Sequence, residues 1–247
     1  MKSLRAELHV HTILSPCADV EMIPPLIVQQ ALDRGIQIIA VTDHNATANI
    51  EAVQNAARGT GLFVLPGMEV QTVEEVHSLC LFDTLDQALA WQEEVSRTLP
   101  AIENQPEHFG EQFVVDETGD FIRRESQLLL TSSTLTIDEA FHKVTGLGGL
   151  FIPAHINRKA FGLLEILGFV PFEIPFPALE ISRHITPDTA RARFPQLRNY
   201  PLVQNGDAHY LEDIIGFNWF SIEEPSISEI GMALRNEQSR GFRLTSL

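Results

Sequence analysis

Cysteine and basic residues are scarce in this chain, and each scarcity excludes a class of protein. The 247 residues include two cysteines, Cys17 and Cys80, too few for a disulfide-stapled secreted domain. Lysine and arginine number 17 against 33 aspartates and glutamates, and the net charge of −16 excludes a basic nucleic-acid coat. No apolar run reaches the roughly 18 residues that a membrane span needs, and MKSLRAELHVHT lacks the pattern of a signal peptide. We therefore expect a soluble, cytoplasmic protein with no membrane contact.

The chain does have enough apolar material for a sizeable core. Hydrophobic residues make up 44% of it and charged residues 20%, which is typical of a globular protein rather than a disordered one. Barrels of the α/β type run to about 200–250 residues as one unit. We therefore expect residues 1–247 to form a single domain.

Short β-rich runs alternate with helical patterns along most of the sequence. Strands are predicted at residues 6–10, 36–41, 62–65, 149–153, 178–181 and 202–204. Helices are predicted at residues 26–34, 46–58, 85–98, 137–145 and 226–236. Pro24 and Pro25 open the first helix, and Ser226 with Glu229 fits a capping box at the last. This alternation predicts βα units and a parallel sheet or barrel.

The stretch from about residue 100 to residue 136 breaks this rhythm. Two apolar runs in it flank an Asp-Glu-Thr-Gly-Asp turn, which predicts a β-hairpin. We interpret 100–136 as an insertion packed on the main body, forming either one wall of a site or a surface excursion without function.

Histidines and carboxylates follow the predicted strands. Because functional sites of α/β folds are built at the carboxyl ends of strands, we expect these side chains to meet at one rim. They are His9 and His11, Asp43 and His44, Glu69, His77, His155, and Asp207 with His209.

The joint pattern of these residues indicates a metal site. His9 and His11 are two residues apart, so a strand puts both imidazoles on one face. Alone, this pair equally fits a structural role, and Asp43 and Asp207 equally fit turn caps. Together, buried carboxylates and imidazoles are costly unless they are paired or coordinated. Such ligands suit Zn, Mn and Fe alike.

Five ordered motifs also carry a resemblance to a known family. HVHT, VTDHN, GMEV, PAHI and GDAH resemble the motifs of the PHP (polymerase and histidinol phosphatase) family over nearly the whole chain. The resemblance implies a distorted (β/α)7 TIM-like barrel, two to three divalent metal ions and phosphoester hydrolysis. It also implies the ligand sets: His9, His11, Glu69 and Asp207 for the first ion, Glu69, His77 and His155 for the second, and His44 with His209 for the third.

The third ion needs a further ligand from the first loop. Many family members have H-x-H-S-x-x-S-D-G there, whereas this chain reads HVHTILSPCADVEMIP. Counted back from Pro24, Asp19 takes the place of the family's aspartate, and we predict it as the ligand. Cys17 and Glu21 are the alternatives. We expect Asp43 to orient ligands or the nearby turn rather than to bind metal.

Three more polar side chains follow strands at the same rim. The guanidinium of Arg158 or Arg183 fits a grip on a substrate phosphate, with a surface salt bridge as the alternative. His184 fits protonation of a leaving group, with a solvated histidine as the alternative. Asn45 and Tyr210 are weaker candidates for substrate contact, and His108 and His142 are expected to be ordinary residues.

These residues predict a metal-dependent phosphoesterase. A metal-bound hydroxide attacks phosphorus without a side-chain nucleophile, and the sequence has no GxSxG, P-loop or Cys-His signature. A cationic centre attracts an anionic substrate. We expect this to be a small phosphorylated metabolite, a nucleotide or a short oligonucleotide, because the charge of −16 argues against long duplex nucleic acid.

Two other functions fit the same residues. A regulatory or partner-binding PHP domain would keep its metals without turnover and use residues 100–136 as a docking surface. An amidohydrolase-type barrel also opens with an HxH pair and ends with an aspartate. Its bridging position is a carboxylated lysine, where this chain has Glu69.

Overall fold

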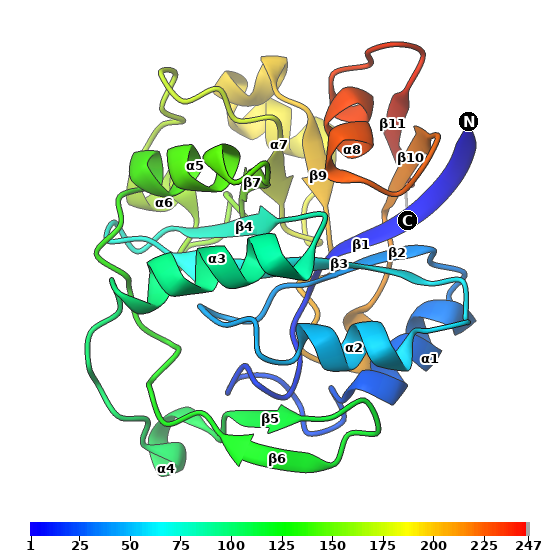
Figure 1. The fold of residues 1–247 in the computed structure, drawn as a ribbon. Helices are drawn as coiled ribbons and strands as arrows, with labels where there is room; N and C mark the ends of the chain where they lie inside the picture. Colours follow the sequence, from blue (N-terminus) through cyan, green and yellow to red (C-terminus); the bar gives the residue numbers. More distant parts are fainter. Residues whose placement is uncertain (246–247) are drawn as a thin grey trace.

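A computed structural model describes residues 1–245 of the chain, and a curled sheet forms its centre (Figure 1). The sheet has seven strands in the order β11-β10-β1-β2-β3-β4-β7. Their bounds are β1 Lys2–Val10, β2 Ile38–Val41, β3 Phe63–Gln71, β4 His77–Leu81, β7 Leu150–Pro153, β10 Asn218–Ile222 and β11 Gly241–Leu244.

The strands of this sheet do not all run in one direction. β1, β2 and β3 are parallel, but β4 is antiparallel to both β3 and β7. Five residues, 72–76, join β3 to β4, and a parallel crossover needs a dozen or more. The expectation of unbroken βα units therefore fails at β4, which pairs with β3 as a hairpin.

Two short strands continue the curl from β7 towards β1. β8 (Leu179–Ile181) and β9 (Leu202–Gln204) form a parallel pair. Ile156, after β7, donates its N–H to the Glu180 carbonyl at 2.9 Å, and Ala208, after β9, bridges to the end of β1. The fold is therefore a mixed α/β half-barrel, and the count of seven βα units stays a prediction.

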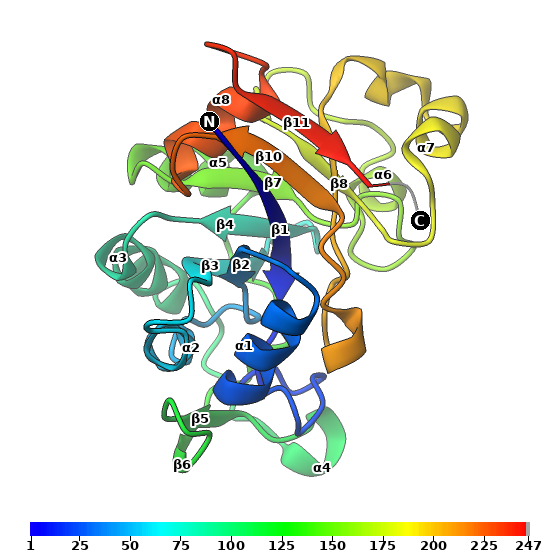
Figure 2. The same cartoon turned by 90° about the vertical axis from the view of Figure 1, so that its right-hand side faces the viewer.

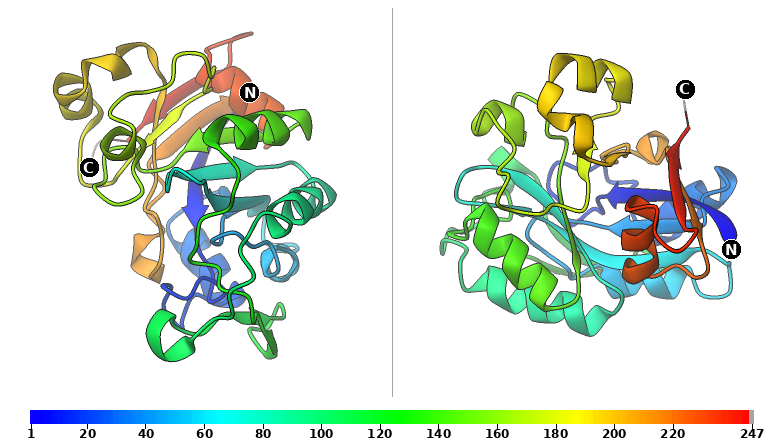
Figure 3. Two further views of the ribbon diagram at one scale, coloured as in Figure 1. Left: turned by 90° about the vertical axis from the view of Figure 1, so that its left-hand side faces the viewer. Right: turned by 90° about the horizontal axis from the view of Figure 1, so that it is seen from above.

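Helices cover the outside of the curled sheet, as the views in Figures 2 and 3 show. They are α1 Pro24–Asp33, α2 Ile50–Ala56, α3 Leu85–Ser96, α5 Ile137–Gly146, α6 Leu163–Ile166, α7 Pro187–Arg193 and α8 Ile227–Leu234, with 3-10 turns η1 Pro195–Asn199 and η2 Leu211–Asp213. Neighbouring residues of β2 face opposite cores: Ile38 lies in one apolar cluster and Ile39 in the other. Both faces of the sheet are thus buried, as in α/β proteins.

Two helix starts differ in detail from the sequence predictions. The predicted helix 46–58 begins at Ile50, because Asn45 has a φ of +50° and Asn49 uses its side chain to bind Phe113 and Val115. At α8 the Ser226 side chain accepts the Glu229 N–H, but the Glu229 carboxylate accepts from Glu223 and Arg240 instead. The reciprocal capping box expected there is therefore half formed.

Residues 100–136 form a small separate layer at the bottom of Figure 1. The predicted hairpin is confirmed: β5 (Phe113–Val115) pairs antiparallel with β6 (Phe121–Arg124), after the short helix α4 (Pro106–Phe109). Leu14, Ala46, Val114 and Leu129 form an apolar cluster that holds this layer on the loops after β1 and β2. That the layer is an insertion in a single domain stays a prediction.

In the part of the chain that the structure describes, no helix is both long enough and apolar enough to cross a membrane. Cys17 is exposed, Cys80 is buried, and both thiols are free.

Candidate metal centre

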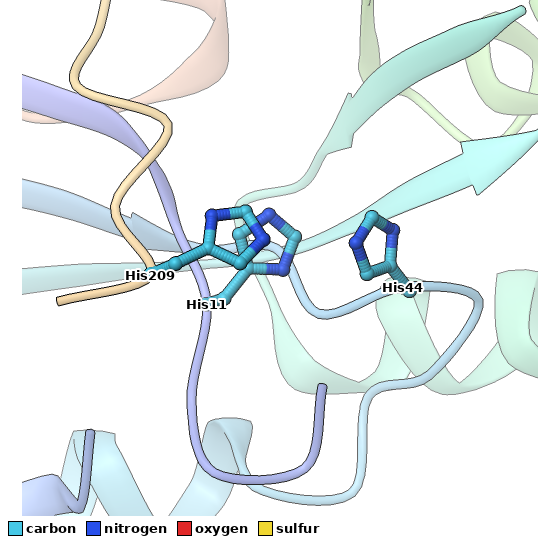
Figure 4. Close-up of side chains that lie close together, drawn as sticks. All are labelled: His11, His44 and His209. Carbon is cyan, nitrogen blue, oxygen red and sulfur yellow. The ribbon is translucent and has the colours of Figure 1, made fainter. Parts of the chain in front are cut away.

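The histidines predicted from the sequence meet at one rim of the curled sheet. His9 is in β1 and His11 directly follows it, while His44, His155 and His209 follow β2, β7 and β9. Because β4 runs antiparallel, His77 at its start reaches the same rim. Figure 4 shows the rings of His11 and His209 lying over one another with His44 beside them, and the centroids of the first two are 4.1 Å apart.

Glu69, at the middle of this rim, is the hub of the cluster. Its carboxylate is buried and lies between 3.0 and 3.4 Å from the nearest nitrogen of five imidazoles. Those five belong to His9 (3.3 Å), His11 (3.4 Å), His44 (3.0 Å), His77 (3.0 Å) and His155 (3.1 Å). The structure thus places the carboxylate that we predict to bridge two ions within reach of five imidazoles.

Asp207 is the second carboxylate of the cluster. Its Oδ1 lies 3.3 Å from His9 Nε2, 3.6 Å from His11 Nε2 and 3.4 Å from His209 Nδ1. Gly206, directly before it, packs closely against the Asp213 carbonyl. A Cβ at this position would lie 1.7 Å from that oxygen, so only glycine fits.

Three overlapping groups of ligand atoms have the spacing of metal sites. In each group every ligand atom lies within 4.8 Å of the others: His9, His11 and Glu69; His44, Glu69 and His77; and His11, His44 and His209. The first and third share His11, and the first and second share Glu69. Imidazole and carboxylate donors in this number suit divalent transition metals.

The protonation of the cluster indicates a need for cations. Burial opposes ionisation of Glu69 and Asp207, yet the surrounding imidazoles hold the pKa of each well below its usual range. Burial also opposes charging of His44, but Glu69 beside it raises its pKa to about 9. Burial lowers the pKa of His77 to about 4 and that of His209 to about 3. The buried Glu69 and the partly buried Asp207 therefore depend on protons for charge balance, a role that metal ions fill in such sites.

Two buried atoms of the cluster also lack a hydrogen-bond partner, and this bears on whether the site fits a metal ion. Among residues 1–245, Glu69 Oε2 and His155 Nδ1 are buried without a hydrogen bond. Unpaired buried polar atoms are rare and call for an explanation. His155 has a φ of +27° and Asp207 a φ of +50°, both in the left-handed region that costs non-glycine residues energy. Buried polar atoms without a hydrogen bond and a strained backbone fit a site shaped for bound ions.

Glu180, a buried glutamate that the sequence analysis missed, contacts the cluster through hydrogen bonds. Both oxygens of Glu180 in β8 lie 3.1 Å from His9 Nδ1, while Oε2 accepts the His155 N–H at 2.7 Å. Asn205 donates to Oε1 at 2.7 Å. A charged residue inside the apolar run ALEIS was the available signal.

Asp43 holds the first loop, as predicted, by hydrogen bonds to its neighbours. Its carboxylate accepts the Thr12 N–H and the hydroxyls of Thr12 and Ser15, each at 2.7 Å. Ser15 Oγ in turn lies 2.9 Å from His11 Nδ1. Asp43 therefore orients a ligand through Ser15, while its own oxygens are occupied.

The first loop places the candidates for the third ion differently from expectation. Asp19 Oδ1 accepts the Glu21 N–H at 2.9 Å, and Asp19 belongs to none of the ligand groups found among the described residues. Cys17 lines a hollow with Asp207 and His209, and it too belongs to none of those groups. Glu21 is exposed.

A pocket of 410 Å³ opens beside the cluster, next to Asp207 and His209. Arg158, Arg183 and His184 all line it. Arg158 pairs with Asp207 at 2.5 Å, and Arg183 is held by Asp213 and the Gly206 carbonyl. The three rim residues therefore do surround one hollow, and both arginines also make the salt bridge weighed as the alternative.

The two weaker candidates for substrate contact, Tyr210 and Asn45, lie in different surroundings. Tyr210 is 49% exposed and lines the same pocket. Asn45 is buried and joins layers instead: it donates to the carbonyls of Leu129 and Thr131 and accepts the Gln71 N–H. Its amide is fully used, so a substrate contact by Asn45 does not fit. His108 and His142 lie exposed outside the cluster, as expected.

A curled α/β half-barrel whose rim gathers six histidines and two carboxylates defines a metal-binding protein of this fold class. The family model described as the PHP domain matches residues 7–146, more than half of the chain. The chain belongs to the PHP domain family.

Two relatives extend this assignment. The 5'-3' exoribonuclease Rnm of Salmonella typhimurium is 35% identical over 75 residues, which are 30% of this chain and 25% of the exoribonuclease. The Bacillus subtilis protein YqxK is 24% identical over 276 residues, 97% of this chain and 64% of YqxK. The chain thus spans less than two thirds of either relative. The family includes hydrolases of phosphate esters.

Solved structures share the fold. The lesion-specific endonuclease Q of Pyrococcus furiosus aligns with a TM-score of 0.74 at 19% identity, over 98% of this chain and 58% of the endonuclease. Endonuclease Q in complex with a 27-mer duplex aligns with a TM-score of 0.72 at 17% identity, over 97% and 58%. This fold therefore accommodates duplex DNA in another protein, which conflicts in part with the expectation drawn from net charge.

Proposed function

We propose that this chain is a metal-dependent phosphoesterase that hydrolyses a phosphate ester at the rim of the barrel. The observation that carries the proposal is Glu69, one buried carboxylate surrounded by five imidazole nitrogens within 3.4 Å. In this proposal the first ion binds His9, His11, Glu69 and Asp207, the second binds Glu69, His77 and His155, and the third binds His44 and His209 with a residue of the first loop.

The residue we propose for that last position is Cys17 rather than Asp19. Cys17 lines the hollow beside Asp207 and His209, whereas Asp19 Oδ1 accepts the Glu21 N–H of its own loop. Thiolate is a ligand that Zn²⁺ accepts beside imidazole. Asp19 then shapes the turn that presents Cys17.

Bound divalent ions would supply a nucleophile at neutral pH and neutralise charge on the phosphoryl group. The chain's own residues then bind and orient the substrate. Arg158 extends into the pocket and uses one N–H on Asp207, so its other donors can hold phosphate oxygens. Arg183, fixed by Asp213, keeps the pocket wall in place, and exposed His184 is positioned to give a proton to a leaving group.

The pocket has room for a substrate of nucleotide size, since its 410 Å³ falls in the usual range of ligand sites. We propose a nucleotide or oligonucleotide ahead of other small phosphorylated metabolites, because a 75-residue stretch of the chain is 35% identical to an exoribonuclease. Zn, Mn and Fe all suit the ligands.

The test combines metal content with turnover. The purified chain is expected to hold two to three ions and to release phosphate or nucleotide from one member of a panel of p-nitrophenyl phosphate, its bis-ester, nucleoside bisphosphates and oligonucleotides. Glu69→Gln is expected to lose at least one ion per chain and on the order of 10²-fold or more in turnover. Unchanged turnover in this variant would contradict the proposal.

The two alternatives give other results in the same experiment. Stoichiometric metal without turnover on any phosphoester favours a regulatory PHP domain. Turnover of amides or lactones in place of phosphoesters favours an amidohydrolase. The matched control is Glu165→Gln, an exposed carboxylate on α6 outside the cluster.

A further inference from the structure

An arginine-lined groove of 660 Å³ lies outside the metal centre, between α7 with η1 and the ends of α8 and β11. Figure 2 shows the end of β11 directed towards α7. Four arginines and no acidic residue line the groove: Arg191, Arg198, Arg235 and Arg243. We call it the arginine groove.

The clustering is unusual for this chain. The groove holds four of the 17 basic residues of a protein with 33 acidic ones. Scattered arginines on such a surface are expected to pair with acids, as Arg97 does with Glu93 and Glu94. An acid-free groove therefore concentrates positive potential where the rest of the molecule repels anions.

Most of these arginines keep hydrogen-bond donors for a ligand. Within residues 1–245 Arg198 and Arg243 form no ion pair, and Arg191 gives one N–H to the Tyr200 carbonyl at 3.4 Å. Arg235 pairs with Glu237. The Arg243 guanidinium lies over the Trp219 ring, 4.7 Å from its centroid, which holds it in place without using its donors.

The groove and the pocket at the metal centre are lined by neighbouring segments of the chain. His184 lines the pocket and Pro187 lines the groove, and three residues span at most about 11 Å between Cα atoms. Leu202 in the groove and Asp207 in the cluster are five residues apart, at most about 18 Å. Tyr200 and Phe242 add aromatic surface to the groove, the combination with cations that single-stranded nucleic acids use.

We propose that the arginine groove binds the phosphates of a nucleic-acid single strand whose reacting phosphate lies at the metal centre. The proposal rests on the proposed function for the reaction, but the binding can be measured without turnover. It assigns the groove a role in holding a chain of several nucleotides rather than one small metabolite.

The test is fluorescence anisotropy with a labelled single-stranded 12-mer made non-hydrolysable by phosphorothioate linkages. The variant Arg198→Gln with Arg243→Gln is expected to bind roughly tenfold more weakly, and its salt dependence is expected to fall by about 1.4 in slope, two phosphate contacts at about 0.7 each. The matched control, Arg58→Gln with Arg97→Gln, removes two exposed cations elsewhere and is expected to bind like the wild type. Arg191→Gln with Arg198→Gln leaves the Trp219 stack intact and repeats the test if the first variant unfolds.

Equal affinity of the groove variants and the control variant would overturn the proposal. A second contrary result would be that inorganic phosphate displaces the labelled 12-mer at the same concentration as unlabelled 12-mer does. The groove would then hold single phosphates. A duplex 12-mer that binds more tightly than the single strand would also overturn it. Turnover of bis(p-nitrophenyl) phosphate by the wild type reports separately on the metal centre, so failure of the proposed function leaves the binding result intact.

Discussion

Glu180 fixes the geometry of the metal centre without belonging to it. It holds the His9 ring, the His155 backbone and the Asn205 amide from one buried carboxylate. Glu180→Gln replaces one acceptor oxygen by a donor, so the His9 ring is expected to lose its fixed orientation. We expect a 10- to 100-fold loss in metal affinity or turnover, roughly the effect of supporting residues in other metal sites.

Metal titration followed by turnover at saturating metal measures this effect. A supporting role predicts that excess metal restores part of the activity, whereas a merely structural role predicts a lower melting temperature and no metal-dependent rescue. Loss equal to that of Glu69→Gln would instead make Glu180 a ligand.

The two cysteines are expected to differ in reactivity. Burial raises the pKa of the Cys80 thiol well above its usual range, whereas Cys17 is exposed. A thiol reagent such as DTNB at pH 8 is therefore expected to modify one thiol per folded chain and two in guanidinium. Cys17→Ser is expected to abolish the reaction of the folded chain with DTNB. If Cys17 binds the third ion, added Zn²⁺ is expected to slow that reaction in the wild type. A Zn²⁺-independent rate would count against Cys17 as a ligand.

At the scale of the element, an ion pair ties the last strand to α8. The Arg240 guanidinium donates to the Glu229 carboxylate at 2.7 Å and holds the pKa of Glu229 below its ordinary value of 4.5. A lowered pKa in the folded state stabilises the fold above that value, and the stabilisation is lost as the pH falls. Glu229→Gln is therefore expected to melt at a lower temperature than the wild type at pH 7.

The difference in melting temperature is expected to shrink as the pH falls from about 5 to values below the ordinary pKa of 4.5. Thermal unfolding across this range measures it, with exposed Glu224→Gln as the matched control. A difference that stays constant with pH would assign the role of Glu229 to packing rather than charge.

Local patterns predicted the elements whose determinants are local. The strands at β1, β2, β7, β8 and β9 and the 113–124 hairpin appear where alternation and turn residues placed them. β4 and the β10-β11 pair were missed because strand direction and pairing depend on contacts far along the chain, such as Lys2 opposite Ile222. α2 starts late because Asn49 bonds to a segment more than 60 residues away.

The same distinction holds for the candidate site. The residues of the cluster could be predicted because most of them lie near the carboxyl ends of strands, which the sheet brings together. The role of Glu180 and the orientation of the Asp19 carboxylate could not be predicted. Both depend on hydrogen bonds, to His9 and to Glu21, that no local pattern encodes.

At the scale of the whole molecule, the metal centre joins distant parts of the chain. The side chains that we propose as its ligands run from His9 to His209 and come from β1, β3 and β4 and from the loops after β1, β2, β7 and β9. A bound ion therefore crosslinks the half-barrel across its rim, and the unfolded chain cannot offer the same ligands together. Metal binding is consequently expected to add directly to the free energy of unfolding.

Metal removal is therefore expected to lower the melting temperature of the whole chain. At 100 times its dissociation constant one ion adds about 2.7 kcal/mol, or about 5–10 °C for a chain of this size. Calorimetry with and without EDTA measures the shift, and Glu69→Gln, which lacks the bridging carboxylate, is expected to show a smaller one. A wild type that melts at the same temperature in both conditions would mean that these eight side chains hold no ion, because binding to the folded state alone must stabilise it.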